Sequence, residues 1–399
     1  MKKLSAALLF TLLTTGCGTL SSYNVDPDDS QTLRYVASHD LQFEVDSLAT
    51  PLIENKVTPG LVVGILLPDG DPQFYSYGVA DKITQARMNP DTVFHVGSIS
   101  KVFLGLIAAK LVDDGVLSWD TTLAKALPDV TLSDDAKTIT LEQLATNTSG
   151  LPRQPYRFKT MLYFTEYLFT GNNFYRNYDM QYIFNYLEKF RAPKEKAEYS
   201  NIGYGLLGYI IEKITEKSLD SLLGEIILQS LYLTRTGYRL EEMPDITNKA
   251  SGYAGDQPKF IRRGQPVPDW SMTEAMKGSA SMYSSARDLL TLAKAYIDEP
   301  LNLKTAINDT LYVRLPRPRE AYAIAWTADS FNGYEIYYMT GVIAGYTSFI
   351  GINKKHSHAV VVLQNSFNWS ANIGYQLLVR LADAREIEEN GVSASFDAE

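Results

Sequence analysis

The strand-like segments of this chain lie near its two ends, and a long, mostly helical stretch separates the two groups. A parallel sheet made of βαβ units would need strands and helices to alternate along the chain, so this order does not fit it. Strands from both ends with helices between them predict an α+β fold: an antiparallel sheet flanked by helices, with an inserted, mostly helical lobe. The residues Pro68 to Pro72 have the composition of a hairpin turn. The strand-like runs are residues 61–67, 74–79, 335–339, 347–352 and 359–364.

Helical periodicity marks the limits of the folded part. Apolar residues repeat at helical spacing over residues 41–52, and a helix over residues 377–382 closes the chain. The segment before the first helix is polar and acidic and suits a tether, and the last residues suit a frayed acidic tail. The predicted divisions of the chain are a signal peptide at 1–16, a lipid-linked tether at 17–40, a domain at 41–384 and a tail at 385–399. Within the domain, an α/β part takes up about 41–114 and 290–384, and a helical lobe takes up about 115–289.

Composition excludes several classes of protein. Of the 399 residues, 45% are hydrophobic, which is too apolar for a disordered chain. A single cysteine excludes a disulfide scaffold and any zinc site built from several thiolates. The net charge of −9, without basic runs, argues against a nucleic-acid partner, because neutralising phosphates needs clustered Lys and Arg. We expect no cofactor, no metal and no obligate protein partner.

The N-terminus predicts export and lipid attachment. Lys2 and Lys3 precede an apolar run over residues 4–13, which is shorter than the ~20 residues that span a bilayer and is typical of a signal peptide. The sequence Thr14-Thr15-Gly16-Cys17 resembles a bacterial lipobox, although Thr14 stands where Leu is usual. This resemblance implies cleavage before Cys17 and a periplasm-facing lipoprotein, and Gly18 favours the outer membrane. A simple signal peptide that happens to contain a cysteine is the alternative.

Ser98 and Lys101 lie together at the start of a predicted buried helix, whose apolar stripe runs over residues 102–112. Ser98 has an ordinary interpretation as an N-cap. A capping box would have Glu or Gln at position 101, whereas a lysine there opposes the helix dipole at a cost of a few tenths of a kcal/mol. Residues three apart share a helix face, and a desolvated lysine at a positive helix end favours its neutral form. A neutral amine can accept a serine proton, so the spacing also indicates a nucleophile with its base.

Ser-x-x-Lys alone is a weak pattern, but here it lies among further motifs in order. They are residues 77–81, 90–94, 96–101, 111–118, 139–144, 146–152, 198–204, 283–289, and Gly341 with 345–348. Together they resemble the serine β-lactamase and penicillin-binding-protein superfamily, in its class C-like branch. The resemblance covers residues 41–384, and Asn147 stands where the family usually has His. It implies the β-lactamase/transpeptidase-like fold.

The resemblance also implies an acyl-enzyme mechanism. Ser98 would be the acylated nucleophile, Lys101 its proton partner, and Tyr199 the shared base that activates the deacylating water. Asn201 would orient the substrate amide or ester. The backbone amides of Ser98 and Val342 would form the oxyanion hole. From local sequence alone, Tyr199 and Asn201 would look like loop residues before a helix.

The third motif departs from the family pattern. It reads Met339-Thr340-Gly341, where the family begins with Lys or His. A thioether has no charge and no donor, and losing a charge-assisted bond costs ~1.5–3 kcal/mol, roughly tenfold to a hundredfold in affinity for an anionic substrate. Thr340 and the backbone of Gly341 can still contact substrate. A basic residue from a loop, Arg153 or Lys277, could supply the missing charge.

The remaining candidates have ordinary explanations. His95 lies three residues before Ser98, but the chain has no Gly-x-Ser-x-Gly, so we interpret it as a rim or packed residue. His356 and His358 lie between two strands without a third ligand nearby, which favours a solvated hairpin turn over a metal pair. Between residues 153 and 190 there are seven Tyr and six Phe, which predict core for the lobe and also an aromatic wall at the cleft mouth.

These features predict an exported serine hydrolase. The family's substrates include β-lactams, peptidoglycan stem peptides and esters. An envelope location favours a DD-peptidase resembling penicillin-binding proteins, the missing cation favours an esterase, and β-lactamase activity should be weak. A catalytically weak binding or scaffold protein is the alternative from a different class.

Overall fold

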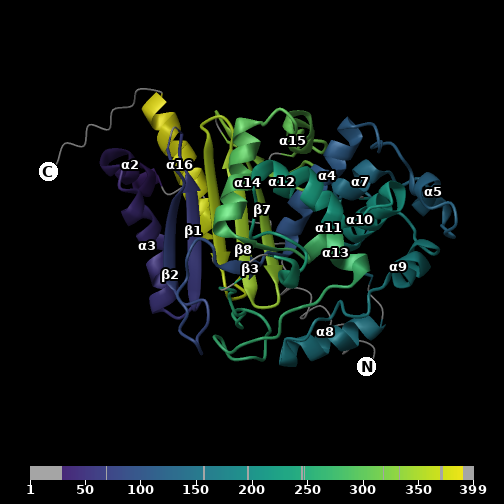
Figure 1. Cartoon of the computed structure of the whole chain (residues 1–399), viewed down its shortest axis with the longest axis horizontal. Coiled ribbons are helices and arrows are strands. Elements are labelled where there is room, and N and C mark those ends of the chain that lie inside the picture. Colours follow the sequence, from purple (N-terminus) through teal and green to yellow (C-terminus); the bar gives the residue numbers. More distant parts are fainter. Residues whose placement is uncertain are drawn as a thin grey trace.

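A seven-stranded antiparallel sheet lies at the centre of the molecule, and both ends of the chain contribute strands to it (Figure 1). The predicted α+β fold class is therefore confirmed. Strand β1 of the N-terminal part pairs with β9 of the C-terminal part, with Leu61 opposite Gln364. The sheet order is β2-β1-β9-β8-β7-β6-β5, and the strands are β1 (Gly60–Leu66), β2 (Gln73–Gly78), β5 (Ala321–Tyr322), β6 (Thr327–Ser330), β7 (Glu335–Ile343), β8 (Tyr346–Asn353) and β9 (His358–Gln364).

The computed structural model describes residues 29–68, 70–155, 158–195, 197–243, 246, 248–317, 319–331, 333–368 and 372–389. The predicted signal peptide and Cys17 lie outside these residues. Within them, no helix has both the length and the apolar character needed to cross a membrane.

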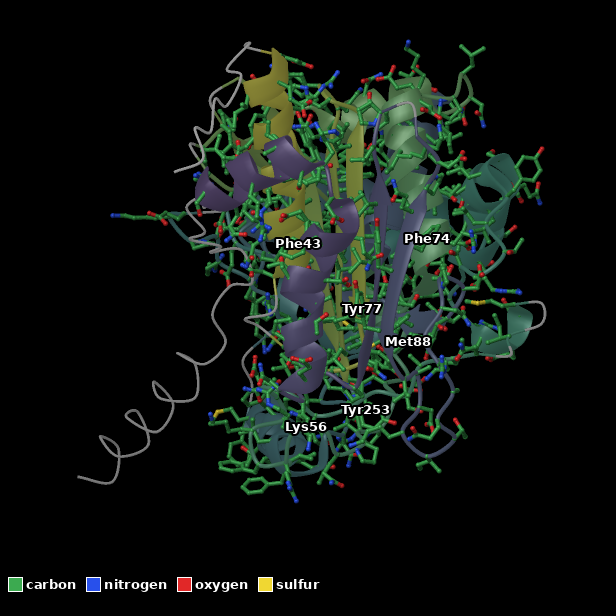
Figure 2. The ribbon with its side chains drawn as sticks, turned by 90° about the vertical axis from the view of Figure 1, so that its left-hand side faces the viewer. Phe43, Lys56, Phe74, Tyr77, Met88 and Tyr253 are labelled. Atoms are coloured by element: carbon green, nitrogen blue, oxygen red, sulfur yellow. The ribbon has the colours of Figure 1, made fainter. Side chains whose placement is uncertain are left out.

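Three helices cover one face of the sheet: α2 (Asp29–Ser38), α3 (Leu41–Glu54) and α16 (Ile373–Glu389). The buried carboxylate of Glu44 in α3 pairs with Arg34 of α2 and Arg380 of α16, so one anion ties the three helices together. Tyr77 of β2, labelled in Figure 2, lies at the boundary between helix and sheet. Its hydroxyl donates a hydrogen bond to Asp46 of α3. The predicted tether at residues 17–40 is thus wrong for its last part, because α2 packs Tyr35 into this core.

The other face of the sheet packs against α4 (Ser100–Asp113), α14 (Ala286–Asp298) and the helical lobe. Because the central strands are covered on both faces, every residue of β1, β8 and β9 is buried. The remaining helices on this side are α5 (Leu123–Ala126), α6 (Asp134–Lys137), α7 (Leu141–Ala145), α8 (Phe158–Thr170), α9 (Met180–Leu187), α10 (Asn201–Thr215), α11 (Leu219–Leu223), α12 (Gln229–Leu231), α13 (Lys277–Ala280) and α15 (Lys304–Leu311).

A second, two-stranded sheet joins the two parts of the chain at the base of α4. Strand β3 (Val93–His95) pairs antiparallel with β4 (Tyr283–Ser285), and the amide of Val96 donates to the carbonyl of Met282. Strands of three residues are too short to show a periodicity, so the sequence did not predict them. The two strands hold the turn before α4 against the last part of the lobe segment, directly before α14.

Candidate active site

Ser98 lies in a single 3-10 turn, η1 (Gly97–Ile99), that leads directly into α4. Gly97 has a φ of +53°, and a Cβ there would lie 3.1 Å from the backbone of Val342, so glycine both permits the turn and lets β7 approach it. No side chain caps the start of η1 or of α4, so the interpretation of Ser98 as an N-cap is wrong. The Ser100 hydroxyl instead secures this turn, donating to the Gly97 carbonyl at 2.6 Å and accepting from the Met282 amide.

Lys101 is fully buried, and its amine has three oxygen neighbours. The Nζ atom lies 3.2 Å from Ser98 Oγ, 2.9 Å from Asn201 Oδ1 and 2.7 Å from the carbonyl oxygen of Ser279. The amide and carbonyl oxygens can only accept hydrogen bonds. A neutral amine would therefore direct its two N–H groups at them and keep its lone pair for the Ser98 hydroxyl, as a general base requires.

The surroundings of Lys101 favour this neutral form. Burial, and then the positive charge of Arg153, hold the pKa of the Lys101 amine well below its ordinary value. No carboxylate is among the three hydrogen-bond partners of its amine. Two features of the structure therefore favour the neutral form of Lys101 that the sequence analysis expected: the burial of its amine and the nearby charge of Arg153.

Tyr199 reaches the same point from the segment before α10. Ser200 begins that helix by accepting a hydrogen bond from the Gly203 amide, which fixes the residue before it. The Tyr199 ring centroid lies 4.9 Å from the Lys101 amine, and Ser98 is close enough to influence the pKa of the Tyr199 hydroxyl. Burial raises the pKa of Tyr199, while Arg153 and Ser98 lower it to a smaller extent. Tyr199 is therefore a phenol in the free protein, so Lys101 is the better proton acceptor and Tyr199 can pass the proton on.

Asn201 connects this centre to the aromatic lobe. Its Oδ1 accepts from Lys101, and its Nδ2 donates to the Tyr175 hydroxyl at 3.0 Å. Tyr175 in turn donates to Gln154 Oε1 at 2.8 Å. Neither Tyr175 nor Gln154 was predicted as an individual site residue, although Tyr175 belongs to the aromatic run. The Ser279 carbonyl could not have been predicted, because a backbone group leaves no side-chain signal.

Strand β7 forms the opposite wall of the nucleophile turn. A Cβ on Gly341 would lie 2.1 Å from the Val96 carbonyl oxygen and 3.1 Å from the Ser98 nitrogen, so only glycine permits this approach. Ser348 of β8 donates to the Val96 carbonyl at 2.8 Å, so β8 is tied to the segment that precedes the Ser98 turn. The backbone of Val342 lies against Gly97, next to the Ser98 amide. The two amides that the resemblance assigns to an oxyanion hole thus belong to neighbouring segments, and the hole itself stays a prediction.

The cation missing from the third motif is not restored from within β7. Met339 is 5% exposed and packs in the core shared with α4, whereas Thr340 is half-buried. Of the two basic residues considered from the sequence, Lys277 is buried in ion pairs with Asp220 and the glutamates 212 and 274. Arg153 is half-buried, and its guanidinium lies over the Tyr199 ring at 5.0 Å. Of the two, only Arg153 lies against a residue of the predicted centre, Tyr199.

His95 has no part in this centre. It is 1% exposed, its Nε2 faces the Ala280 carbonyl at 3.1 Å, and its ring stacks on Tyr283. Burial lowers the pKa of His95 to about 4, so the ring is neutral at physiological pH. The interpretation as a packed residue is therefore confirmed.

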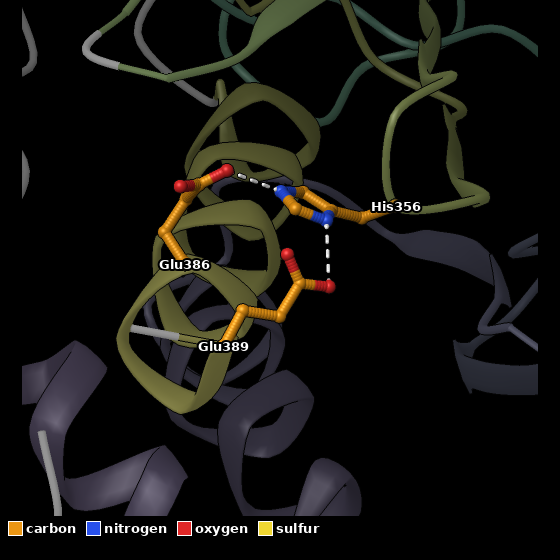
Figure 3. A group of neighbouring side chains, drawn as sticks. All are labelled: His356, Glu386 and Glu389. Atoms are coloured by element: carbon orange, nitrogen blue, oxygen red, sulfur yellow. Dashed lines mark hydrogen bonds and ion pairs between the residues drawn. The ribbon is translucent and has the colours of Figure 1, made fainter. Parts of the chain in front are cut away.

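The expected solvated turn at His356 and His358 is wrong, because both residues are buried. His356 places Nε2 2.7 Å from Glu386 and Nδ1 3.4 Å from Glu389, and both carboxylates come from α16 (Figure 3). The ligand atoms lie within 4.8 Å of one another, yet each ring nitrogen faces a different carboxylate and Lys355 already pairs with Glu386. The group is a set of polar contacts that joins the β8–β9 turn to α16, and the local sequence could not reveal a partner 30 residues away.

The aromatic residues of the lobe divide into core and surface. Tyr167, Phe174 and Tyr178 are buried, and Tyr167 and Phe174 pack edge-to-face on Trp270. Phe169 of α8 is exposed and stacks on the equally exposed Phe260, with ring centroids 4.4 Å apart. The predicted core of the lobe is therefore confirmed. An aromatic wall that contacts substrate stays a prediction.

Comparison with known proteins agrees with this geometry. Residues 45–383 match the Beta-lactamase family. The chain is 27% identical over 341 residues to Protein flp of Staphylococcus aureus (strain NCTC 8325 / PS 47), a match that covers 82% of this chain and 64% of that protein. This chain therefore spans less than two thirds of the length of that relative.

Solved structures share the fold. The class C beta lactamase from Rhodobacter sphaeroides superposes with a TM-score of 0.72 at 25% identity, covering 85% of this chain and 99% of that one. The Beta-Lactamase/D-Alanine Carboxypeptidase from Pseudomonas syringae superposes with a TM-score of 0.71 at 21% identity, covering 85% and 98%. At that lower identity the second likeness concerns the fold alone.

Proposed function

The chain belongs to the Beta-lactamase family, and from this premise we propose that it is an exported serine hydrolase that forms an acyl-enzyme on Ser98. The observation that carries the proposal is the 3.2 Å contact between the buried Lys101 amine and the Ser98 hydroxyl, with the Tyr199 ring beside the amine. Among the described residues, none of the hydrogen-bond partners of this amine is a carboxylate. The favoured substrates are peptidoglycan-type peptides or esters. Weak β-lactam hydrolysis is expected at most, because Met339 supplies no cation for a substrate carboxylate.

The proposed reaction has two stages. Lys101 takes the Ser98 proton while Oγ bonds to the substrate carbonyl carbon, and the resulting oxyanion lies against the backbone amides of Ser98 and Val342. The bond to the leaving amine or alcohol then breaks, and Tyr199 gives its phenol proton to that group while it takes the Ser98 proton from Lys101. Water attacks the acyl carbon and gives a proton to the same pair. The bond between the acyl carbon and Oγ then breaks, the carboxylic acid is released, and the proton returns to Oγ as the Ser98 hydroxyl.

A trapping experiment tests this proposal. The purified protein is incubated with a fluorescent penicillin, with p-nitrophenyl esters and with a peptide ending in D-Ala-D-Ala, and intact mass and product release are followed. We expect an acyl mass on Ser98 and turnover of the ester or the peptide, both absent in Ser98→Ala. Neither adduct nor turnover in the native protein would favour the scaffold alternative. Turnover that survives Ser98→Ala would assign the activity to another group.

Peptidase and esterase activities are the two candidates within this proposal. The proposed envelope location supports the peptidase, because peptidoglycan peptides are found there. The uncharged Met339 supports the esterase, because a neutral ester needs no cation at that position. Release of D-alanine from the peptide in the trapping experiment would favour the former.

We also propose that the protein is a lipoprotein attached through Cys17 and facing the periplasm, and that Gly18 directs it to the outer membrane. The support is the signal-like N-terminus and the lipobox-like residues 14–17. We expect the native protein in the membrane fraction with a lipid-sized mass on Cys17, and Cys17→Ser in the soluble fraction. A native protein that is soluble and lacks this mass would leave a simple signal peptide.

A further inference from the structure

Arg153 places a positive charge beside Tyr199 and close enough to Lys101 to influence its pKa. Its guanidinium carbon lies 5.0 Å from the centre of the Tyr199 ring. Burial is the largest influence on the pKa of Lys101 and of Tyr199, and the Arg153 charge comes next and lowers both. Its backbone is fixed as well, because its carbonyl accepts from the Asn201 amide at 3.2 Å. Arg153 is therefore held at the site by the segment that presents Tyr199 and Asn201.

No ion pair neutralises this charge within the described part of the chain. The carboxyl group of Glu198 lies nearby: burial raises its pKa, and the backbone amide of Arg153 and then the Arg153 charge lower it to a smaller extent, without an ion pair between the two side chains. Lys101 cannot balance Arg153 either, because it is itself a cation or a neutral amine. A half-buried guanidinium beside a buried amine is costly unless an anion joins it. The site beside Ser98 therefore favours a ligand that carries one negative charge.

The Arg153 guanidinium belongs to a different segment from Met339, where the third motif lacks the family's cation. The family's cation would lie at Met339 on β7, whereas the Arg153 carbonyl accepts from the first residue of α10. Arginine also differs from lysine at such a position, because its planar fork can bind both oxygens of a carboxylate. A carboxylate would then be recognised from the α10 side.

We propose that Arg153 forms an anion subsite beside Ser98, and that the substrate carries a free carboxylate which this guanidinium binds. The inference rests on the proposed hydrolase function and adds a substrate class to it. The substrate class is one with a carboxylate either on its acyl part or on its leaving group. The two positions are distinguished by the experiment below. Glu198 is the internal competitor for the guanidinium.

Two matched pairs of substrates test the subsite. In the first pair the acyl chain differs: the p-nitrophenyl half-ester of pimelic acid is compared with its methyl ester. In the second the leaving group differs: a benzoylglycyl thioester of thioglycolate is compared with that of methyl thioglycolate. We expect Arg153→Gln to lower kcat/KM for the anionic member of one pair roughly tenfold to a hundredfold more than for its neutral partner. The affected pair shows which part of the substrate bears the carboxylate.

Three further variants separate recognition from general effects. Arg153→Lys should restore part of the preference, and Glu198→Gln should increase it by removing the competing charge. Arg317→Gln is the matched control, because Arg317 lies over the Tyr322 ring at 4.9 Å, one tyrosine farther from the nucleophile. Equal losses for Arg153→Gln and Arg317→Gln would mean long-range attraction and no subsite. Turnover of all four substrates without a selective loss in Arg153→Gln would overturn the subsite alone, whereas no turnover in the native protein would overturn the function.

Discussion

Replacing Lys101 by methionine is expected to lower kcat/KM about 10²–10⁴-fold while the protein stays folded. Methionine has nearly the length of lysine and suits the buried site, but it has no lone pair that could take the Ser98 proton. The loss should therefore fall on formation of the acyl-enzyme. The measurement is the rate constant for ester acylation under single-turnover conditions, with circular dichroism as the check on folding.

The same variant has a pH signature in stability. Because burial lowers the pKa of Lys101 in the folded protein, the unfolded chain binds one more proton between that lowered pKa and the ordinary value of 10.5. The free energy of unfolding of the native protein therefore rises with pH in this window, by at most about 1.4 kcal/mol per pH unit from this group. Lys101→Met removes that contribution, so its stability relative to the native protein should be highest at neutral pH and decline towards pH 9.

Urea unfolding of both proteins at pH 7, 8 and 9 measures this difference. Lys110→Met is the matched control, because Lys110 lies on the same helix, pairs with Asp113 and Asp114, and has a raised pKa. A difference between native protein and Lys101→Met that does not change with pH would mean that Lys101 is charged in the folded state. Lys101 would then be unsuitable as the base.

The centre of the fold could be predicted from the sequence because its signals are local. The apolar runs at 61–67 and 359–364 are long enough to show as strands, and they became β1 and β9. The Ser98–Lys101 pair was also readable, since a spacing of three on a helix fixes the relative position of two side chains. These inferences needed only residues close together in the chain.

Contacts between distant segments could not be predicted in this way. The environment of the Lys101 amine includes the Ser279 carbonyl, which is 178 residues away and has no side-chain signature. His356 gave the expectation of a solvated turn because its carboxylate partners lie on α16. Helix α2 was assigned to a tether because its polar composition hides the few side chains, such as Tyr35, that pack. Tyr199 was found only through the family resemblance.

The choice between Arg153 and Lys277 shows the same limit. Both are single basic residues in a loop-like context, and their local sequences do not separate them. Three carboxylates surround Lys277, so its charge is used inside the protein. Arg153 is distinguished by the Tyr199 ring beneath it. The electrostatic role of a residue therefore depends on which partners the fold brings to it.

Adding one methyl group at Gly341 is expected to lower the rate of acyl-enzyme formation about 10²–10³-fold, the usual effect of losing one oxyanion donor. The new Cβ would lie 2.1 Å from the Val96 carbonyl oxygen and 2.4 Å from Ser348 Oγ, so β7 and the Ser98 turn have to separate. That separation moves the Val342 amide away from the Ser98 amide. The overpacking should also destabilise the protein by about 1–3 kcal/mol.

Acylation of Gly341→Ala is therefore measured at a temperature where thermal unfolding shows the variant to be fully folded. Gly224→Ala is the control, because a Cβ at Gly224 meets no atom within 4 Å, so this variant should keep the native rate and lose no stability. If Gly341→Ala has a lower unfolding temperature but acylates at the native rate, β7 supports the turn without supplying an oxyanion donor. If both the acylation rate and the unfolding temperature of Gly341→Ala fall as expected, the close approach of β7 to the Ser98 turn is needed for acyl-enzyme formation. A strand residue that contacted no neighbour would tolerate alanine.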